Sequence, residues 1–316
     1  MRLKIAYNTK DYLHNDINHV ENNLRTKSII ENLIENLKIN KELSNIKLIN
    51  ENDTKNIDDN FLINLYKSTH SEKYIEDILL LSKKVKGLYN LDPDTYFNEN
   101  TINVINTNIK LLINLVSDLV ENKINHAIAY IRPPGHHAEK DKAMGFCIIN
   151  NVAVIATYFK EFLKIKKIAI IDFDAHHGNG TENIFKNNKD ILYLSTHAYP
   201  FYPFTGFKSN PEYYKFNYPL NVFANDQELL NIYESELEKI ILDFKPEFII
   251  ISMGYDIHLD DPITYMRITN NGIDKLHKIL LNKLNKYKIL WVLEGGYNLQ
   301  VLKYSSINLI KNIIQN

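Results

Sequence analysis

Six short apolar runs, most of them bounded by polar or turn-forming residues, are spread along the chain. Each run is largely uninterrupted, which is the pattern of strands that are covered on both faces. The predicted strands are LKIAY (3–7), HAIAYI (126–131), KIAIID (167–172), ILYLS (191–195), EFIIISM (247–253) and ILWVLE (289–294).

Stretches with helical spacing separate these runs. Apolar residues recur three and four positions apart at 102–119, 229–244 and 273–284. Residues 8–125 precede the dense strand pattern and are predicted to be mainly helical. Strands alternating with helices predict an α/β fold, in which helices cover both faces of one mostly parallel sheet. Because no linker, repeat or composition break interrupts 1–316, we expect a single domain.

Composition narrows the class of protein. The 316 residues are 45% hydrophobic and 24% charged, as in ordinary globular proteins, and the net charge of -1 comes without a dense Lys/Arg cluster. We therefore expect no direct binding to nucleic acid or to an anionic membrane. The first ten residues lack the apolar core of a signal peptide, so a cytoplasmic location is the default expectation. A single cysteine, Cys147, excludes an internal disulfide and a cysteine-based zinc site.

Candidate metal ligands follow the strand predicted at 167–172. Asp172, Asp174 and His176 come at every second position, and an extended strand would place all three on one face. Each alone is readily explained as a cap or a satisfied core group. Together they are harder to explain without a cation, because each buried carboxylate costs several kcal/mol unless it is compensated. Carboxylate and imidazole ligands suit zinc.

A further ligand is expected from the strand predicted at 247–253. Asp256 follows it, and side chains from neighbouring strands meet outside the carboxyl end of a parallel sheet. Three protein ligands would leave the open position that a catalytic zinc site needs. On spacing alone, a turn aspartate ahead of Asp-Asp-Pro is an equally good interpretation of Asp256.

Two more clusters lie at predicted strand ends. RPPGHHA (132–138) carries His136 and His137 in a loop, where a histidine pair could equally be surface residues. GFCIINNVAV (145–154) follows, and its Gly-Phe pair could line a narrow site. LEGGYN (293–298) ends another strand, and its two glycines would let the backbone approach closely and expose Tyr297.

These four clusters, in this order, resemble the motifs of the histone deacetylase and acetylpolyamine amidohydrolase superfamily, whose fold is shared with arginase. RPPGHHA, GFC-I-I-NN-A, D-x-D-x-HHGNGT and LEGGYN are closer to class II and bacterial members than to class I. The resemblance covers nearly the whole chain. Weaker matches are HVENNLR (19–25), THSEKYI (69–75) and LDPDTY (91–96).

The resemblance implies a mechanism and its cofactors. One zinc ion per chain would be held by Asp174, His176 and Asp256. His137 would be the general base, with His136 as its electrostatic partner. The resemblance also implies a structural potassium ion at Asp172, Asp174, His176, Ser195 and Thr196.

Three further residues receive supporting roles from the same resemblance. Tyr297 would donate to the oxyanion of the intermediate. Asp172 would orient His136, and Asn179 would orient His137. Class I members carry aspartate at this last position, so a neutral partner should make His137 less basic.

The resemblance places an acyl-lysine tunnel between Gly145, Phe146 and Tyr202, with Arg25 near an inner acetate pocket. The chain departs from the family at Val20 and Asn23, where both prolines of His-Pro-Glu-x-Pro are missing, and at Phe204, which replaces a glycine of the tunnel rim. Ile263 stands where the polyamine-selective class II member has a glutamate. This favours acylated lysine in a protein or peptide, with acetylpolyamine as the alternative substrate.

Two other functions compete with a zinc deacetylase. An arginase-type dinuclear manganese enzyme needs a bridging carboxylate where this chain has Gly178, although Asp256-x-His258 could hold part of a second site. A catalytically inactive acyl-lysine binder would retain the tunnel and lose a ligand, His137 or Tyr297. None of these is lost. The sequence does not indicate an oligomeric state.

Overall fold

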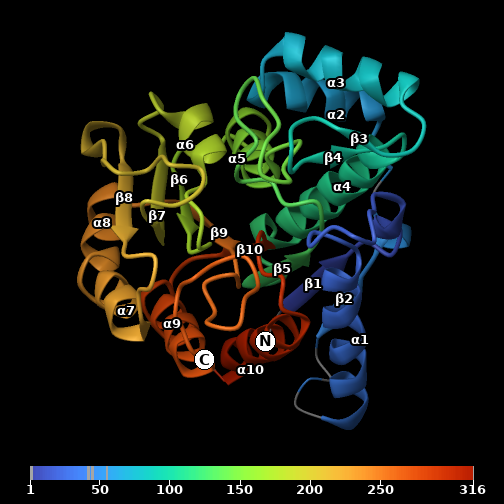
Figure 1. The fold of residues 1–316 in the computed structure, drawn as a ribbon. Coiled ribbons are helices and arrows are strands. Elements are labelled where there is room, and N and C mark those ends of the chain that lie inside the picture. The colour runs from blue at the N-terminus through green and yellow to red at the C-terminus, as the bar shows by residue number, and fades with distance from the viewer. Residues whose placement is uncertain (1–2, 41–42, 44–45, 55, 316) are drawn as a thin grey trace.

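A computed structural model describes residues 3–40, 43, 46–54 and 56–315, and its centre is an eight-stranded sheet (Figure 1). The strands lie in the order β2-β1-β5-β10-β9-β6-β7-β8, and every neighbouring pair is parallel. Their bounds are β1 Leu3–Tyr7, β2 Lys47–Ile49, β5 His126–Tyr130, β6 Ile168–Asp172, β7 Ile191–Ala198, β8 Lys215–Leu220, β9 Phe248–Met253 and β10 Ile289–Leu293. A small antiparallel pair, β3 (Tyr89–Asn90) and β4 (Tyr96–Phe97), lies apart from the sheet.

Helices cover both faces of the sheet. Figure 1 shows α1 and α7 to α10 on one side, and α2 to α5 on the other. The helices are α1 Leu24–Ile39, α2 Asp59–Thr69, α3 Glu72–Lys84, α4 Thr101–Val120, α5 Asn151–Glu161, α6 Asn179–Phe185, α7 Asp226–Ser235, α8 Leu237–Phe244, α9 Asn270–Lys283 and α10 Leu299–Gln315. Among the described residues, no helix combines the length and the apolar character needed to cross a bilayer.

Alternation along the strands divides the core into two layers. In β6, Ala169 and Ile171 pack into the layer under α1 and α7 to α10, whereas Ile168 and Ile170 pack into the layer under α2 to α5. Successive side chains of a strand point to opposite faces, so a strand buried on both faces is apolar at nearly every position. The uninterrupted apolar runs of the sequence are therefore explained by the two helical layers.

The predicted α/β fold with a parallel sheet is confirmed, and three local predictions are corrected. The edge strands β2 and β8 were not predicted. The helix predicted at 229–244 is two helices that meet at Glu236. The third correction concerns Asp172, which ends β6, so that Asp174 and His176 lie beyond the strand.

Candidate functional site

Three buried side chains from two neighbouring strand ends converge on one point. β6 and β9 pair in register as far as Asp172 and Ser252. Beyond these positions, one ligand atom each of Asp174, His176 and Asp256 lies within 4.8 Å of the others. His176 Nδ1 is 2.9 Å from Asp256 Oδ2 and 3.1 Å from Asp174 Oδ1. The structure thus brings together the three residues expected to hold zinc.

The chain reaches this point through side-chain turns and not through an extended strand. Asp172 Oδ1 accepts the backbone N–H of Asp174 at 3.1 Å, and Asp174 Oδ1 accepts that of His176 at 2.9 Å. Aspartates form such bonds two residues ahead and bend the backbone. As a result Asp172 is not part of the ligand cluster, which corrects the expectation that all three side chains share one strand face. Its other oxygen, Oδ2, lies 3.0 Å from His136 Nδ1.

Two glycines allow the strand ends to close around the carboxylates. A Cβ atom on Gly254 would lie 2.1 Å from Asp174 Oδ2, and one on Gly295 would lie 2.3 Å from Asp256 Oδ2. Neither distance is possible for a real side chain. The backbone N–H of Gly295 instead donates to Asp174 Oδ2 at 2.7 Å. Glycine is therefore required at both positions for the backbone to approach the ligands.

The charges of the cluster fit a cation. Asp174 and Asp256 are both fully buried, and burial together with the Asp174 carboxylate raises the pKa of Asp256 to about 7. Burial opposes protonation of His176, but the two carboxylates outweigh it and raise the pKa of His176 to about 10. The surroundings of Nδ1 thus stabilise a positive charge strongly. Two oxygens and one nitrogen around such a point are ligands that zinc accepts.

His136 and His137 lie beside this cluster, on the loop that follows β5. Their ring centroids are 4.1 Å apart, and the rings differ in environment. Burial lowers the pKa of His136, but Asp174 and Asp172 outweigh it and raise that pKa to about 10. Burial lowers the pKa of His137, and the positive charge of His136 lowers it further, so that it lies well below its usual range. Because their pKa values are shifted in opposite directions, His136 is suited to be the charged partner and His137 the neutral base.

Asn179 begins α6 and contacts His137. Its Oδ1 lies 2.8 Å from His137 Nδ1, so the amide oxygen accepts the proton of that nitrogen. The other ring nitrogen of His137, Nε2, is then the one left without a proton. The position expected to orient His137 thus contacts it directly.

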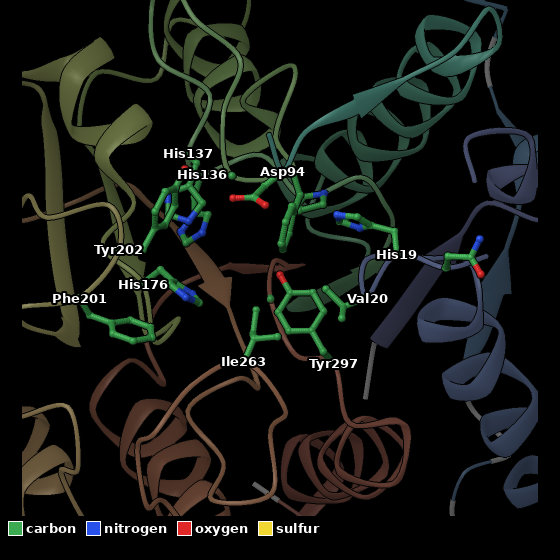
Figure 2. A pocket seen from close by; sticks show the side chains of 15 residues that line it. His19, Val20, Asp94, His136, His137, His176, Phe201, Tyr202, Ile263 and Tyr297 are labelled. Atoms are coloured by element: carbon green, nitrogen blue, oxygen red, sulfur yellow. The ribbon is translucent and has the colours of Figure 1, made fainter. Parts of the chain in front are cut away.

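Tyr297 lies across the cavity from the histidines, on the loop after β10. Figure 2 shows its hydroxyl pointing into the cavity, with the rings of His136, His137 and His176 on the opposite side. Burial raises the pKa of Tyr297 well above its usual value, so the hydroxyl keeps its proton and can donate it in a hydrogen bond. Asp261 accepts the backbone N–H of Tyr297 at 2.7 Å and fixes its position.

The cavity in front of the cluster has a volume of about 440 Å³. Gly145, Phe146, Tyr202 and Ile263 line it, as expected from the sequence, and Val20 lies on its wall. Residues that line it and were not predicted are Asn18, His19, Asp94, Pro134, Phe201 and Gly295. Asn18, His19 and Asp94 lie in or beside the weaker motifs, whereas Pro134 and Gly295 lie inside RPPGHHA and LEGGYN. Four aromatic side chains, Phe146, Phe201, Tyr202 and Tyr297, line it together with the histidines.

Arg25 does not line this cavity. Its guanidinium lies 4.8 Å from the ring centroid of Tyr297, and its Nε donates to the Gly296 carbonyl at 2.7 Å. Glu21 pairs with Arg25 at 3.0 Å and with Arg132 at 2.7 Å, and all three side chains are fully buried. The network ties the start of α1 to the loops that carry the histidines and the tyrosine. The sequence did not indicate that Glu21 holds this network together.

A second buried carboxylate, that of Glu294, accepts hydrogen bonds from the backbone of the loop that carries His136 and His137. Glu294 Oε2 accepts the backbone N–H groups of Gly135 at 2.7 Å and His136 at 3.1 Å. Burial raises the pKa of Glu294 to about 7, although His136 opposes the shift. Its position inside the LEGGYN motif was visible in the sequence, but its partners were not.

The residues expected at a potassium site lie at the end of β6, in the turn that follows it and on β7. Asp172 and Ser195 are register partners, and both are buried. The side-chain hydroxyls of Ser195 and Thr196 are engaged elsewhere, with His197 at 2.9 Å and with Tyr233 at 2.8 Å. An ion there would therefore rely on backbone carbonyls.

Among the described residues, only one group of three metal-ligating side chains comes together. His258 Nδ1 accepts the backbone N–H of Asp260 at 3.1 Å and does not join it. At the bridging position of a dinuclear enzyme, a Cβ on Gly178 would lie 2.4 Å from Asp172 Oδ2. The described chain thus offers one metal position and lacks the bridging group.

Comparisons with known proteins relate the chain to one family. The sequence model of the histone deacetylase domain matches residues 19–313. A probable deacetylase of Archaeoglobus fulgidus is 34% identical over an alignment of 252 residues, and the match covers 76% of this chain and 68% of the relative. Histone deacetylase 15 of Arabidopsis thaliana is 33% identical over 78% of this chain, which spans 45% of that relative.

Solved structures give the same result. The crystal structure of the HDA15 HD domain has a TM-score of 0.85 and 28% sequence identity to this chain. The match covers 100% of this chain and 88% of the other. The chain therefore spans a domain of the longer plant relative and not its full length.

Proposed function

The chain belongs to the histone deacetylase family, and from that premise we propose that it is a zinc-dependent deacetylase that hydrolyses the amide of an acylated lysine in a protein or peptide. One observation carries the proposal. His176 of the buried Asp-His-Asp cluster, the histidine pair and Tyr297 all line one cavity.

Asp174, His176 and Asp256 would hold the zinc ion. When bound, zinc would polarise the amide carbonyl and lower the pKa of a water molecule. Potassium is proposed at Asp172, Asp174, His176, Ser195 and Thr196, several of them acting through backbone carbonyls, on the family resemblance. The register pairing of Asp172 with Ser195 supports a site between β6 and β7.

The remaining side chains divide the proton transfers between them. His137 Nε2 would take the proton of the attacking water and later deliver a proton to the leaving amine. His136, held charged by Asp172 and Asp174, would stabilise the negative charge that develops nearby. The Tyr297 hydroxyl would donate to the oxyanion.

The shape of the cavity supports a long, uncharged acyl-lysine side chain as the substrate group. Phe146 and Tyr202 supply aromatic walls, and Ile263 is apolar where a polyamine-selective enzyme carries a glutamate. Asp94 is the one carboxylate on the cavity wall outside the ligand cluster, among the lining residues described. An acylated lysine in a peptide fits such walls better than a free polyamine does.

The direct test is hydrolysis of an acetyl-lysine peptide by the purified, zinc-loaded protein. We expect acetate release that a chelator abolishes and that added zinc restores. Acetylputrescine should be cleaved with a kcat/KM at least tenfold lower. Binding of the peptide without acetate release would instead support an inactive binder, and a preference for acetylputrescine would contradict the proposed substrate.

Replacing Ile263 by glutamate should shift the preference toward acetylpolyamines. A carboxylate at the half-exposed position 263 would attract the amine of acetylputrescine, an interaction worth about 1 kcal/mol, or roughly a fivefold change in kcat/KM. The measurement is the ratio of kcat/KM for acetylputrescine to that for the peptide. Ile263→Gln is the matched uncharged control and should leave the ratio within about twofold.

A further inference from the structure

Asn179 connects the proposed general base to a carboxylate outside the motif residues already assigned. Its Oδ1 lies 2.8 Å from His137 Nδ1, and its Nδ2 donates to Glu139 Oε1 at 2.6 Å. A carboxylate accepts hydrogen bonds and donates none. Glu139 therefore obliges the amide nitrogen of Asn179 to face it, and the amide oxygen to face His137.

The orientation of this amide decides the tautomer of His137. An oxygen facing Nδ1 requires the ring proton on Nδ1, which leaves Nε2 free to take a proton in the cavity. A flipped amide would present its NH₂ group to Nδ1 and favour the opposite tautomer, in which Nε2 already carries a proton. Only the first tautomer can act as a base toward a water in the cavity.

We infer that Glu139 is a positioning residue, which acts through Asn179 to keep the Nε2 atom of His137 available as the base. The inference rests on the proposed function for its link to catalysis. It adds a third member to the His137–Asn179 pair and assigns a role to the residue that directly follows the RPPGHHA motif.

The backbone around Glu139 is held firmly enough for this role. Its carbonyl accepts from His70 Nδ1 at 2.8 Å, and its N–H donates to the Lys142 carbonyl at 2.9 Å. The backbone N–H of Asn150 donates to His70 Nε2 at 3.1 Å, which fixes that ring in turn. Glu139 is half-buried; its backbone is fixed by the contacts with His70 and Lys142, and its carboxylate by Asn179.

Glu139 also accounts for the amide at position 179. An aspartate there would place two carboxylates at the 2.6 Å separation that the Asn179–Glu139 contact shows. Two like charges at such a distance cannot both ionise without a large cost. The residues at 139 and 179 are therefore coupled: a carboxylate at one requires an amide at the other.

Five variants of the full chain test this coupling with the acetyl-lysine peptide. Glu139→Ala should lower kcat about tenfold with KM within twofold, as loss of an outer-shell partner does. Glu139→Gln should retain kcat within about threefold, because its amide oxygen still accepts from Asn179. Asn179→Asp should lose about tenfold or more. The double variant Asn179→Asp/Glu139→Gln should regain at least fivefold over Asn179→Asp.

The fifth variant, Asp141→Ala, removes an exposed negative charge from the same loop and should leave kcat unchanged. Full activity of Glu139→Ala would overturn the inference, and so would a double variant no better than Asn179→Asp.

A measurement without turnover separates this inference from the proposed function. In ¹⁵N-histidine-labelled, zinc-loaded protein, the His137 ring should show the Nδ1–H tautomer in the wild type and in Glu139→Gln. Glu139→Ala should shift its nitrogen resonances toward the Nε2–H form. His137→Ala assigns the signal. If the wild type hydrolyses nothing, the proposed function fails while this readout still decides the role of Glu139, and an unchanged tautomer in Glu139→Ala would refute it.

Discussion

Tyr297→Phe should lower kcat for the acetyl-lysine peptide by about 10²–10³-fold while KM changes by less than about threefold. Removing one donor to a developing oxyanion has an effect of this size, because the contact forms mainly in the transition state. The phenyl ring itself would keep its packing against Phe146, at 5.7 Å between centroids, and under the Arg25 guanidinium. Binding of the substrate and folding should therefore be preserved.

The measurement is steady-state kinetics of the zinc-loaded variant beside its thermal unfolding. Tyr265→Phe is the matched control, because Tyr265 is exposed and contacts the ring of Phe201 at 5.9 Å outside the cavity. It loses the same hydroxyl and should retain full activity. Should Tyr297→Phe keep its kcat, the tyrosine would not be the oxyanion donor, and the proposed mechanism would need another group in that place.

The sheet was predictable where burial imposes a simple pattern. The inner strands β5, β10, β9, β6 and β7 are apolar along most of their length, because helices cover both faces of the sheet. β8 was missed for the same physical reason. It is an edge strand with half-buried positions and carries Pro219, so KFNYPL lacks the continuous apolar run.

The part of the site that could be predicted consists of residues that follow the ends of strands. Asp174, His176 and Asp256 lie far apart in sequence, yet parallel strands bring their carboxyl ends to one edge, so adjacency follows from topology alone. The turn that separates Asp172 from the ligands was not predictable, since a period of two describes a strand only while the strand continues. Its end depends on side-chain hydrogen bonds two residues ahead.

Supporting residues were missed because their partners lie on distant loops. Asp261 accepts from the backbone of Tyr297, and Glu139 accepts from Asn179, and neither contact follows from spacing or composition. The placement of Arg25 near an inner pocket stays a prediction, and its contact with the tyrosine loop through Gly296 was not foreseen. In each case the interaction involves irregular backbone, whose conformation a hydrophobic pattern does not specify.

Asp256→Asn should abolish zinc binding and lower kcat/KM by about three orders of magnitude. The carboxamide nearly preserves the shape of the side chain but removes the charge that a divalent ion needs, and metal polarisation is worth several kcal/mol to such a reaction. Metal analysis should find one zinc per wild-type chain and almost none in the variant. Two ions per wild-type chain would revive the dinuclear alternative.

Thermal unfolding gives the same prediction a second readout. Zinc at 100 times its Kd stabilises a folded protein by about 2.7 kcal/mol, so it should raise the wild-type Tm by roughly 5 °C and leave that of Asp256→Asn unchanged. Without metal, the Tm of Asp256→Asn should equal or exceed that of the wild type. The pKa of Asp256 is raised to about 7 when folded, against about 4 when unfolded, so the metal-free wild type loses stability as pH rises through that interval.

At pH 8 the metal-free wild type therefore holds two buried, ionised carboxylates beside one protonated His176, whereas in the variant Asp174 alone is ionised beside that ring. Metal-free Asp256→Asn should consequently unfold at the same temperature as the wild type or above it. The amide oxygen of the substituted side chain can still accept the N–H of Ala175, which Asp256 accepts at 3.0 Å in the wild type. A metal-free variant much less stable than the wild type would show that Asp256 serves the fold itself. A metal-free variant that is at least as stable as the wild type would show that the carboxylate of Asp256 serves to bind a cation.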